Sequence, residues 1–280
     1  MSIWQSILLG LIQGVTEFLP ISSSGHLILF QQIFNVQLEG NDMLFDTLLH
    51  LGTLVAVFIA FRKRICALIK SFFRSIPQLF KGQLKPSTAD GNQRMIFFII
   101  LSVLPLFILV PFKDKIESIA YGSTLFVGIA LLFNSVILLL CDRIVAGRKK
   151  AETMTVKDAL IVGGVQAVAV LPGISRSGST ITAGVACGMK RKFAAEYSFV
   201  LSIPTILGSV VLNVLDVVKE GVFNTGDIPA YIIGMVVAAV SGFFSIKLLE
   251  ILLKSKKFSV FSIYCAAVGI FAIVYFLLNK

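Results

Sequence analysis

Two similar stretches, Gln13–His26 (QGVTEFLPISSSGH) and Gln166–Ser179 (QAVAVLPGISRSGS), interrupt the hydrophobic sequence of this chain and determine how it can fold. An internal repeat of this kind indicates two structurally related units. Polar, helix-breaking sequence at membrane depth persists only where it is buried in protein or lines a cavity, so the repeat predicts a polar site in mid-membrane. A shift of 153 residues aligns Gln13 with Gln166, Ser22 with Ser175, Ser24 with Ser177 and Gly25 with Gly178.

The composition around these stretches is that of a membrane protein. Of 280 residues, 56% are hydrophobic and 14% are charged, whereas a soluble chain carries about 25% charged residues. Several segments reach the ~20 apolar residues that cross a bilayer. We therefore predict an all-α polytopic membrane protein with six transmembrane helices, at Met43–Phe61, Met95–Phe112, Tyr121–Cys141, Ala194–Val218, Ile228–Leu253 and Phe258–Leu278.

The two interrupted regions, Ile3–Phe34 and Val156–Met189, have flanks too short to span the bilayer upright. Each is predicted to be a re-entrant helix hairpin, which dips in and returns on the same side. Each half (about 1–142 and 153–280) consists of one hairpin and three spans. Because three is an odd number of crossings, the second half is inserted upside down relative to the first. The halves therefore form inverted-topology repeats within a single integral membrane domain. The two polar tips are then expected to meet near the midplane.

The distribution of Lys and Arg predicts the orientation. The connectors 62–94, 143–157, 190–192 and 254–257 hold 19 basic residues, and the opposite side holds 4. The positive-inside rule then places both termini outside. It also explains the net charge of +10 without a nucleic-acid partner. The connector Lys63–Gln93 is expected to be an interfacial amphipathic segment on the cytoplasmic face. The four dispersed cysteines are interpreted as small apolar residues.

The first motif places Gln13 and Glu17 on one helix face. Pro20 ends that helix, and Ser22, Ser23, Ser24 and Gly25 open the next with good N-cap residues, followed by His26. In the second motif, the break at Pro172 and Gly173 leads to Ser175, Arg176, Ser177, Gly178 and Thr180. Free backbone N–H groups at two helix starts, with a guanidinium, form a site for a phosphate or pyrophosphate.

A carboxylate such as Glu17 needs a reason to lie beside a bound anion. Either a divalent cation bridges the two, or Glu17 acts as a general base. Each of these residues also has a structural interpretation. Glu17 and Arg176 would form a buried ion pair, His26 would be a packed core histidine, and the serines would cap helices. His50 and Asn134, in apolar spans, are interpreted as structural polar residues. Neither a G-x-x-x-x-G-K-[ST] loop nor an H-E-x-x-H helix occurs.

The two motifs together resemble the signature regions of the undecaprenyl-pyrophosphate phosphatases linked to bacitracin resistance. The resemblance covers essentially the whole chain. It implies hydrolysis of undecaprenyl pyrophosphate to undecaprenyl phosphate and phosphate in the bacterial plasma membrane, with Mg2+ or Ca2+ and a site open to the outer face. The family allows Glu or Gln at the position of Gln13, which weakens Gln13 as a charged metal ligand and favours Glu17.

By this resemblance, the catalytic residues are Glu17, Ser23, His26 and Arg176, with Glu17 also holding the metal. Substrate-binding residues are Gln13, Ser22, Ser24, Gly25, Ser175, Ser177, Gly178 and Thr180. Ser23 is the expected nucleophile with His26 as its base, and direct attack by water or His26 stays open. The expected partners are the polyprenyl pyrophosphate and membrane lipid, with no nucleic acid, and a homodimer is left open.

Two other function classes fit parts of the pattern. Inverted repeats with broken helices also build secondary transporters, so a lipid-phosphate flippase or an ion-coupled carrier is the main alternative. The close Ser, His and Glu cluster suits bond breaking better than transit. An intramembrane serine protease would pair Ser23 or Ser177 with a histidine, but it would leave the paired anion sites unused.

Overall fold

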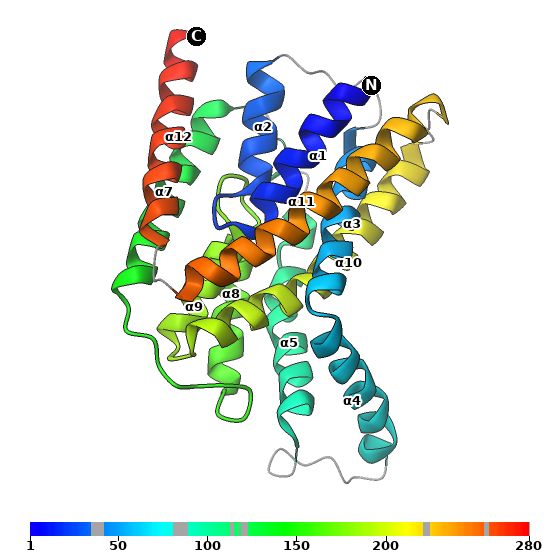
Figure 1. The fold of residues 1–280 in the computed structure, drawn as a ribbon, viewed down its shortest axis with the longest axis vertical. Coiled ribbons are helices and arrows are strands. Elements are labelled where there is room, and N and C mark those ends of the chain that lie inside the picture. The colour runs from blue at the N-terminus through cyan, green and yellow to red at the C-terminus, as the bar shows by residue number, and fades with distance from the viewer. Residues whose placement is uncertain are drawn as a thin grey trace.

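The computed structural model describes residues 1–34, 42–80, 89–112, 115–116, 118, 123–220, 225–254 and 258–279. These residues form helices joined by turns, with an isolated β-bridge between Lys149 and Met189 (Figure 1). The elements are α1 (Ile3–Phe18), α2 (Ser23–Ile33), α3 (Asp42–Ala60), α4 (Arg62–Phe80), α5 (Gly91–Phe107), η1 (Val110–Phe112), α7 (Thr124–Arg143), α8 (Val156–Val168), α9 (Arg176–Ala186), α10 (Arg191–Glu220), η2 (Thr225–Asp227), α11 (Ile228–Lys254) and α12 (Phe258–Leu278).

The described helices bear out an all-α, multi-pass membrane protein. Five are long and apolar enough to cross a bilayer, and a sixth crossing results if α3 and α4, bent by 88° at Phe61, count as one span. Each predicted span falls on a helix: Met43–Phe61 on α3, Met95–Phe112 on α5 with η1, Tyr121–Cys141 on α7, Ala194–Val218 on α10, Ile228–Leu253 on α11 and Phe258–Leu278 on α12. Tyr121 itself lies outside the described residues.

The surfaces of these helices are apolar where they face outward. Phe107, Ile129, Val136 and Ile263 are each more than half exposed. A water-soluble monomer rarely shows such large side chains over a continuous surface, whereas a lipid-facing helix does so routinely. Apolar lipid therefore takes the place that a second protein layer would occupy in a soluble bundle.

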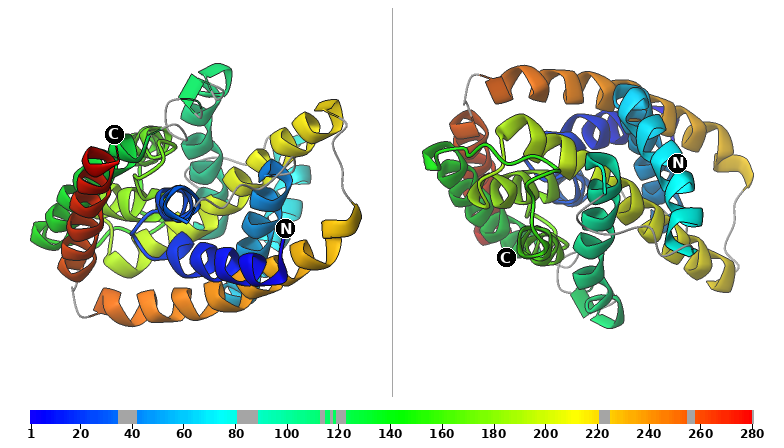
Figure 2. Two further views of the ribbon diagram at one scale, coloured as in Figure 1. Left: turned by 90° about the horizontal axis from the view of Figure 1, so that it is seen from above. Right: turned by 90° about the horizontal axis from the view of Figure 1, so that it is seen from below.

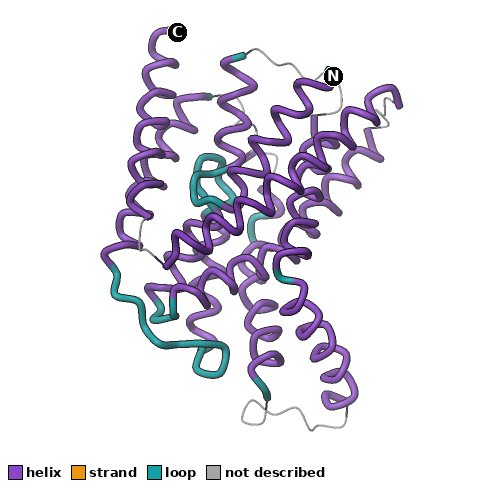
Figure 3. The backbone as a smooth tube through the Cα atoms, viewed as in Figure 1, coloured by secondary structure: helices purple, strands orange, loops and turns teal. Residues whose placement is uncertain are grey.

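The helices pack in pairs that join the two ends of the chain. α7 packs along α12, α1 along α11, and α5 along α8, while α3 contacts both α10 and α11 (Figures 1 and 2). The start of α1 and the end of α12 lie at the same end of the molecule (Figure 1). Both interrupted regions fold as predicted into helix–turn–helix units, α1–α2 and α8–α9, and their turns lie side by side in the interior (Figure 3).

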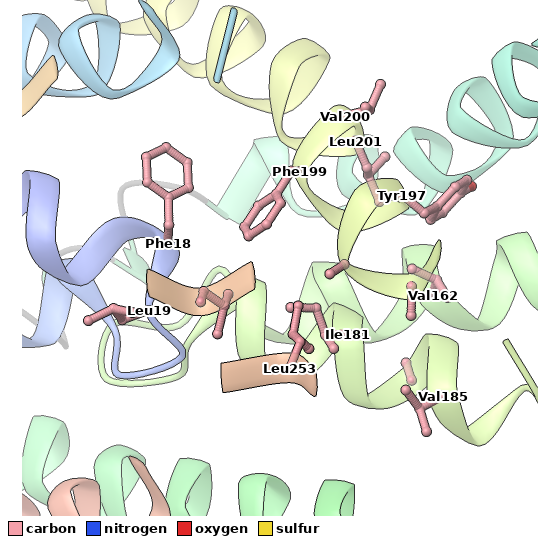
Figure 4. Packing of buried hydrophobic residues seen from close by; sticks show 14 of the residues in the cluster. Phe18, Leu19, Val162, Ile181, Val185, Tyr197, Phe199, Val200, Leu201 and Leu253 are labelled. Carbon is pink, nitrogen blue, oxygen red and sulfur yellow. The ribbon is translucent and has the colours of Figure 1, made fainter. Parts of the chain in front are cut away.

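The core lies beside these turns. Phe18, at the end of α1, packs edge-on against Phe199 of α10 with ring centroids 5.7 Å apart (Figure 4). Phe199 in turn contacts Phe61 at the bend between α3 and α4, with centroids 5.5 Å apart. This row of aromatic rings fixes the end of α1, and with it the position of the neighbouring Glu17.

The predicted amphipathic segment within Lys63–Gln93 is in part the helix α4. It carries Lys63, Lys70 and Arg74 together with the exposed apolar residues Phe72, Phe73, Ile76, Leu79 and Phe80. The residues after Phe80, up to 88, lie outside the described part of the chain. A helix with separate basic and apolar faces suits a membrane surface.

Candidate functional site

The turn between α1 and α2 brings the polar residues of the first motif into the interior. α1 ends at Phe18 because Leu19 is extended and Pro20 cannot continue the helix. Ser22 caps α2: its Oγ accepts a hydrogen bond from the backbone N–H of Gly25, at 3.3 Å. The backbone of Ser22 has φ of 72°, a left-handed conformation that is uncommon for residues other than Gly, Asn and Asp.

The turn between α8 and α9 is built in a related way. Gly173 has φ of +95°, which a residue without Cβ adopts at little cost. Ser175 caps α9 through a hydrogen bond from the N–H of Gly178 to its Oγ, at 3.1 Å. Arg176, the first residue of α9, therefore projects from a helix start that lies beside the start of α2.

The two turns are joined by hydrogen bonds. The N–H of Gly173 donates to Ser22 Oγ at 3.1 Å, so one hydroxyl caps its own helix and holds the opposite turn. Asn134 of α7, fully buried, donates from Nδ2 to the Pro20 carbonyl at 3.0 Å and accepts at Oδ1 from the Ser175 N–H at 3.1 Å. One side-chain amide thus fixes the spacing between the two turns.

Glu17 is the centre of the site. Its Oε2 accepts a hydrogen bond from Ser23 Oγ at 2.5 Å and one from Gln13 Nε2 at 3.1 Å. Its Oε1 accepts a hydrogen bond from Nη2 of Arg176, which comes from the other half of the chain. The Glu17 side chain is 5% exposed and that of Arg176 is 20% exposed.

This arrangement can bind an anion and polarise a hydroxyl. Two helix starts present free N–H groups and positive dipole ends, and the partly exposed guanidinium adds a formal charge. Ser23 Oγ already donates to a carboxylate, which is the contact that a hydroxyl needs in order to transfer its proton as it attacks. Among the described residues, no group of three or more His, Cys, Asp and Glu side chains could hold a metal ion unaided.

The structure brings together the predicted residues Gln13, Glu17, Ser23 and Arg176, but gives others structural partners. Ser177 Oγ lies 3.1 Å from Ser175 Oγ and donates to the Leu19 carbonyl at 3.4 Å. Thr180 Oγ1 donates to the Arg176 carbonyl at 2.8 Å and lies 2.6 Å from Ser198 Oγ.

Ser24 is half-buried, with its Oγ 3.4 Å from Ser22 Oγ. Gly25 and Gly178 lie where the turns pack on one another. A Cβ at Gly25 would lie 3.0 Å from Gly173, and one at Gly178 would lie 2.9 Å from Pro20.

The hydrogen bonds of His26 lead away from Ser23. Its Nδ1 lies 2.7 Å from the Ser22 carbonyl and its Nε2 lies 2.9 Å from the hydroxyl of Tyr264 on α12. The hydroxyl of Ser23 is hydrogen-bonded to Glu17. The hydrogen-bond acceptor next to Ser23 is therefore the carboxylate of Glu17.

Tyr264, which contacts the predicted site residue His26, was not among the residues predicted from the sequence. Tyr264 carries no sequence signal, because tyrosine is enriched at membrane interfaces whether or not it belongs to a site. Its partner His26 is 238 positions away. The interpretation of Asn134 as a structural polar residue is confirmed, and its position within an otherwise apolar span is the signal of the bridge that it forms.

Comparisons with known proteins identify the family of this chain. The family model described as bacitracin resistance protein BacA matches residues 6–271. A protein of Methanosphaera stadtmanae is 41% identical over 98% of each chain, and one of Carboxydothermus hydrogenoformans is 40% identical over 98% of this chain and 97% of its own. One of Bacteroides fragilis is 38% identical over 97% of each chain. All three are named undecaprenyl-diphosphatase. With this identity over nearly its full length, the chain belongs to the BacA family of bacitracin resistance proteins.

Proposed function

We propose that this protein hydrolyses undecaprenyl pyrophosphate to undecaprenyl phosphate and inorganic phosphate, which recycles the lipid carrier of cell-wall synthesis and confers bacitracin resistance. The observation that carries the proposal is the contact of one carboxylate with both motifs. Glu17 accepts hydrogen bonds from Ser23 of its own hairpin and from Arg176 of the other, between two helix starts. The names of the relatives agree with this activity.

In the proposed reaction, the terminal phosphoryl group lies between the starts of α2 and α9. Arg176 and the backbone N–H groups stabilise the negative charge on its oxygens, where most of the catalysis of phosphoryl transfer arises. Ser23 Oγ attacks the phosphorus and its proton passes to Glu17. The bond to the bridging oxygen breaks, and undecaprenyl phosphate leaves. Water then attacks the phosphoserine and the bond from phosphorus to Ser23 Oγ breaks. Glu17 returns its proton to Ser23 Oγ, and phosphate leaves with the oxygen and the protons of the water.

A divalent cation fits the residues beside Glu17. Gln13 donates from Nε2 to Glu17, while its Oε1 is buried without a hydrogen-bond partner. An orphaned amide oxygen next to a carboxylate supplies the oxygen ligands that Mg2+ and Ca2+ prefer. Glu17 and Gln13 would hold the ion, and oxygens of the pyrophosphate would complete its shell. When bound, the cation would neutralise phosphoryl charge.

We further propose six membrane spans and two re-entrant hairpins in inverted repeats (about 1–142 and 153–280), with both termini outside and the site open to the outer face. The distribution of Lys and Arg supports this orientation. Reciprocal contacts support the repeats. Gly25 packs on Gly173 and Gly178 on Pro20, and an exchange of the halves converts one contact into the other. In the same way, α1 packs on α11 as α8 packs on α5.

The test is phosphate release from undecaprenyl pyrophosphate by the purified full chain in detergent. It is run with Mg2+, with Ca2+ and with a chelator, on wild type and on Glu17→Ala, His26→Ala and Arg176→Ala. A matched control is Glu250→Ala, whose partner Lys247 is near the surface. We expect metal-dependent release that Glu17→Ala and Arg176→Ala abolish and the control keeps. His26→Ala should cause a smaller loss, because its imidazole holds the Ser22 carbonyl at the start of α2. No release by folded wild-type protein would reject hydrolysis and favour transport.

A further inference from the structure

His26 and Tyr264 form a contact that the proposed reaction does not use. The two rings are parallel within 6°, with centroids 5.6 Å apart, and the Tyr264 hydroxyl lies 2.9 Å from His26 Nε2. Stacking and hydrogen bonding therefore act on the same imidazole from the same residue. His26 belongs to α2 of the first half and Tyr264 to α12 at the end of the second.

The two hydrogen bonds fix which nitrogen of His26 carries the hydrogen. A carbonyl oxygen only accepts, so Nδ1, at 2.7 Å from the Ser22 carbonyl, must be protonated. In the neutral ring, Nε2 then has a lone pair, and the phenol of Tyr264 can donate to it. A flip of the imidazole would replace both nitrogens by carbons and break both bonds. The contacts thus specify one tautomer and one ring orientation.

Packing alone does not explain the position of Tyr264. Its side chain is 43% exposed, while the preceding residue Ile263 is 71% exposed and the following residue Cys265 is fully buried. On a helix this apolar and this exposed, a phenol without a partner would leave a polar group facing lipid, which is costly. His26 supplies the partner that such a tyrosine needs.

We propose that Tyr264 is a positioning residue for His26, which holds the imidazole in the Nδ1–H tautomer above the start of α2. This inference rests on the function proposed above. Through His26 Nδ1, the contact also supports the carbonyl of Ser22, the residue with left-handed backbone that links the two turns. Outer-shell partners that orient a metal-ligating histidine typically contribute about tenfold to a hundredfold in metal affinity or activity, and we expect the lower end of that range from the partner that orients His26.

The experiment compares Tyr264→Phe, which keeps the stacked ring and removes the hydroxyl, with Tyr264→Leu, which removes both. Tyr275→Phe on the same helix is the matched control, because its ring lies against Phe271. kcat and KM are measured for undecaprenyl pyrophosphate in detergent. The protein is also labelled with 15N-histidine for NMR; it has two histidines, so His26→Gln assigns the signals.

We expect Tyr264→Phe to lower kcat about tenfold with KM little changed, and to shift the Nε2 signal of His26. Tyr264→Leu should lower kcat further and mix the tautomers, and the control should do neither. Unchanged kcat and histidine signals would overturn the proposal. So would a fall in kcat with the histidine signals unmoved, or a rise in kcat. If wild type releases no phosphate, the proposed function fails, while the NMR spectra still report the contact.

Discussion

The two turns at the centre of the molecule do the same structural task with different backbones. Each places a serine at an N-cap: Ser22 for α2 and Ser175 for α9. In the first turn the serine itself is left-handed, with φ of 72°, and in the second Gly173 takes φ of +95° while Ser175 stays at −74°. A residue in an unfavoured conformation persists where its surroundings fix it. The hydrogen bond from Gly173 to Ser22 Oγ is such a constraint.

The turns also differ in what they offer to a ligand. The first contributes a carboxylate, a hydroxyl and an imidazole (Glu17, Ser23 and His26), whereas the second contributes one guanidinium, Arg176. Most of α9 is buried, and at the start of α2 only Gly25 is buried among the first four residues. The two copies of the repeat have therefore diverged in chemistry. The first turn carries the groups that the proposed reaction uses, and the second is a buried support that presents one cation.

The largest effect is expected from breaking the ion pair that joins the two turns. Glu17→Gln and Arg176→Gln should each lower kcat about 10²–10³-fold. Each leaves a buried charge unpaired, so each should also destabilise the protein by about 3 kcal/mol. The double variant should be more stable than either single variant, since no unpaired charge remains. This double-mutant cycle is measured by the rate of phosphate release and by the midpoint of thermal unfolding in detergent.

Arg74→Gln is the matched control for this cycle, because the ion pair of Arg74 with Asp90 is exposed. Arg74→Gln should leave kcat unchanged and should lower the stability by no more than about 1 kcal/mol. Additive effects of Glu17→Gln and Arg176→Gln on stability and activity would contradict a shared site.

An intermediate effect is expected from removing the bridge between the turns. Asn134→Leu keeps a similar volume but leaves the Pro20 carbonyl and the Ser175 N–H without a partner. A buried unpaired polar group costs about 1–3 kcal/mol, so the midpoint of unfolding should fall clearly. Ser135→Ala is the control, because Ser262 keeps its bond to the Ser135 carbonyl. Equal stability of Asn134→Leu and Ser135→Ala would contradict the role of Asn134 as a bridge between the two turns.

The smallest effect distinguishes the two caps. Ser175→Ala removes one backbone cap and should cost about 1 kcal/mol. Ser22→Ala removes hydrogen bonds from Gly25 and Gly173 and should cost more. Ser22→Gly loses the same bonds but relieves the left-handed backbone, so it should lie between the two. Chemical unfolding gives the loss of stability of each of the three variants. A larger loss for Ser175→Ala than for Ser22→Ala would contradict the greater structural role of Ser22.

Much of the fold could be predicted from the sequence, because long apolar segments and Pro-Gly breaks are local signals. The helices, the two interrupted hairpins and the contact of Glu17 with Arg176 follow from them. The partner of His26 could not be predicted, since nothing near His26 indicates which residue of α12 will face it. The hydrogen-bond partner of Ser23 could not be predicted either. Ser23 contacts Glu17, six positions earlier on the other side of the turn, while His26 contacts Tyr264.

The long sequence separations in the site determine when it can exist during synthesis. Glu17 meets Arg176 159 positions later, and His26 meets Tyr264 238 positions later. A nascent chain that holds only the first motif has Glu17 without its partner Arg176, and an unpaired carboxylate in apolar surroundings is costly. Synthesis of the second motif removes that cost, and α12 then supplies the tyrosine that contacts His26. The hydrolytic centre is thus assembled last, and an incomplete chain in the membrane is catalytically silent.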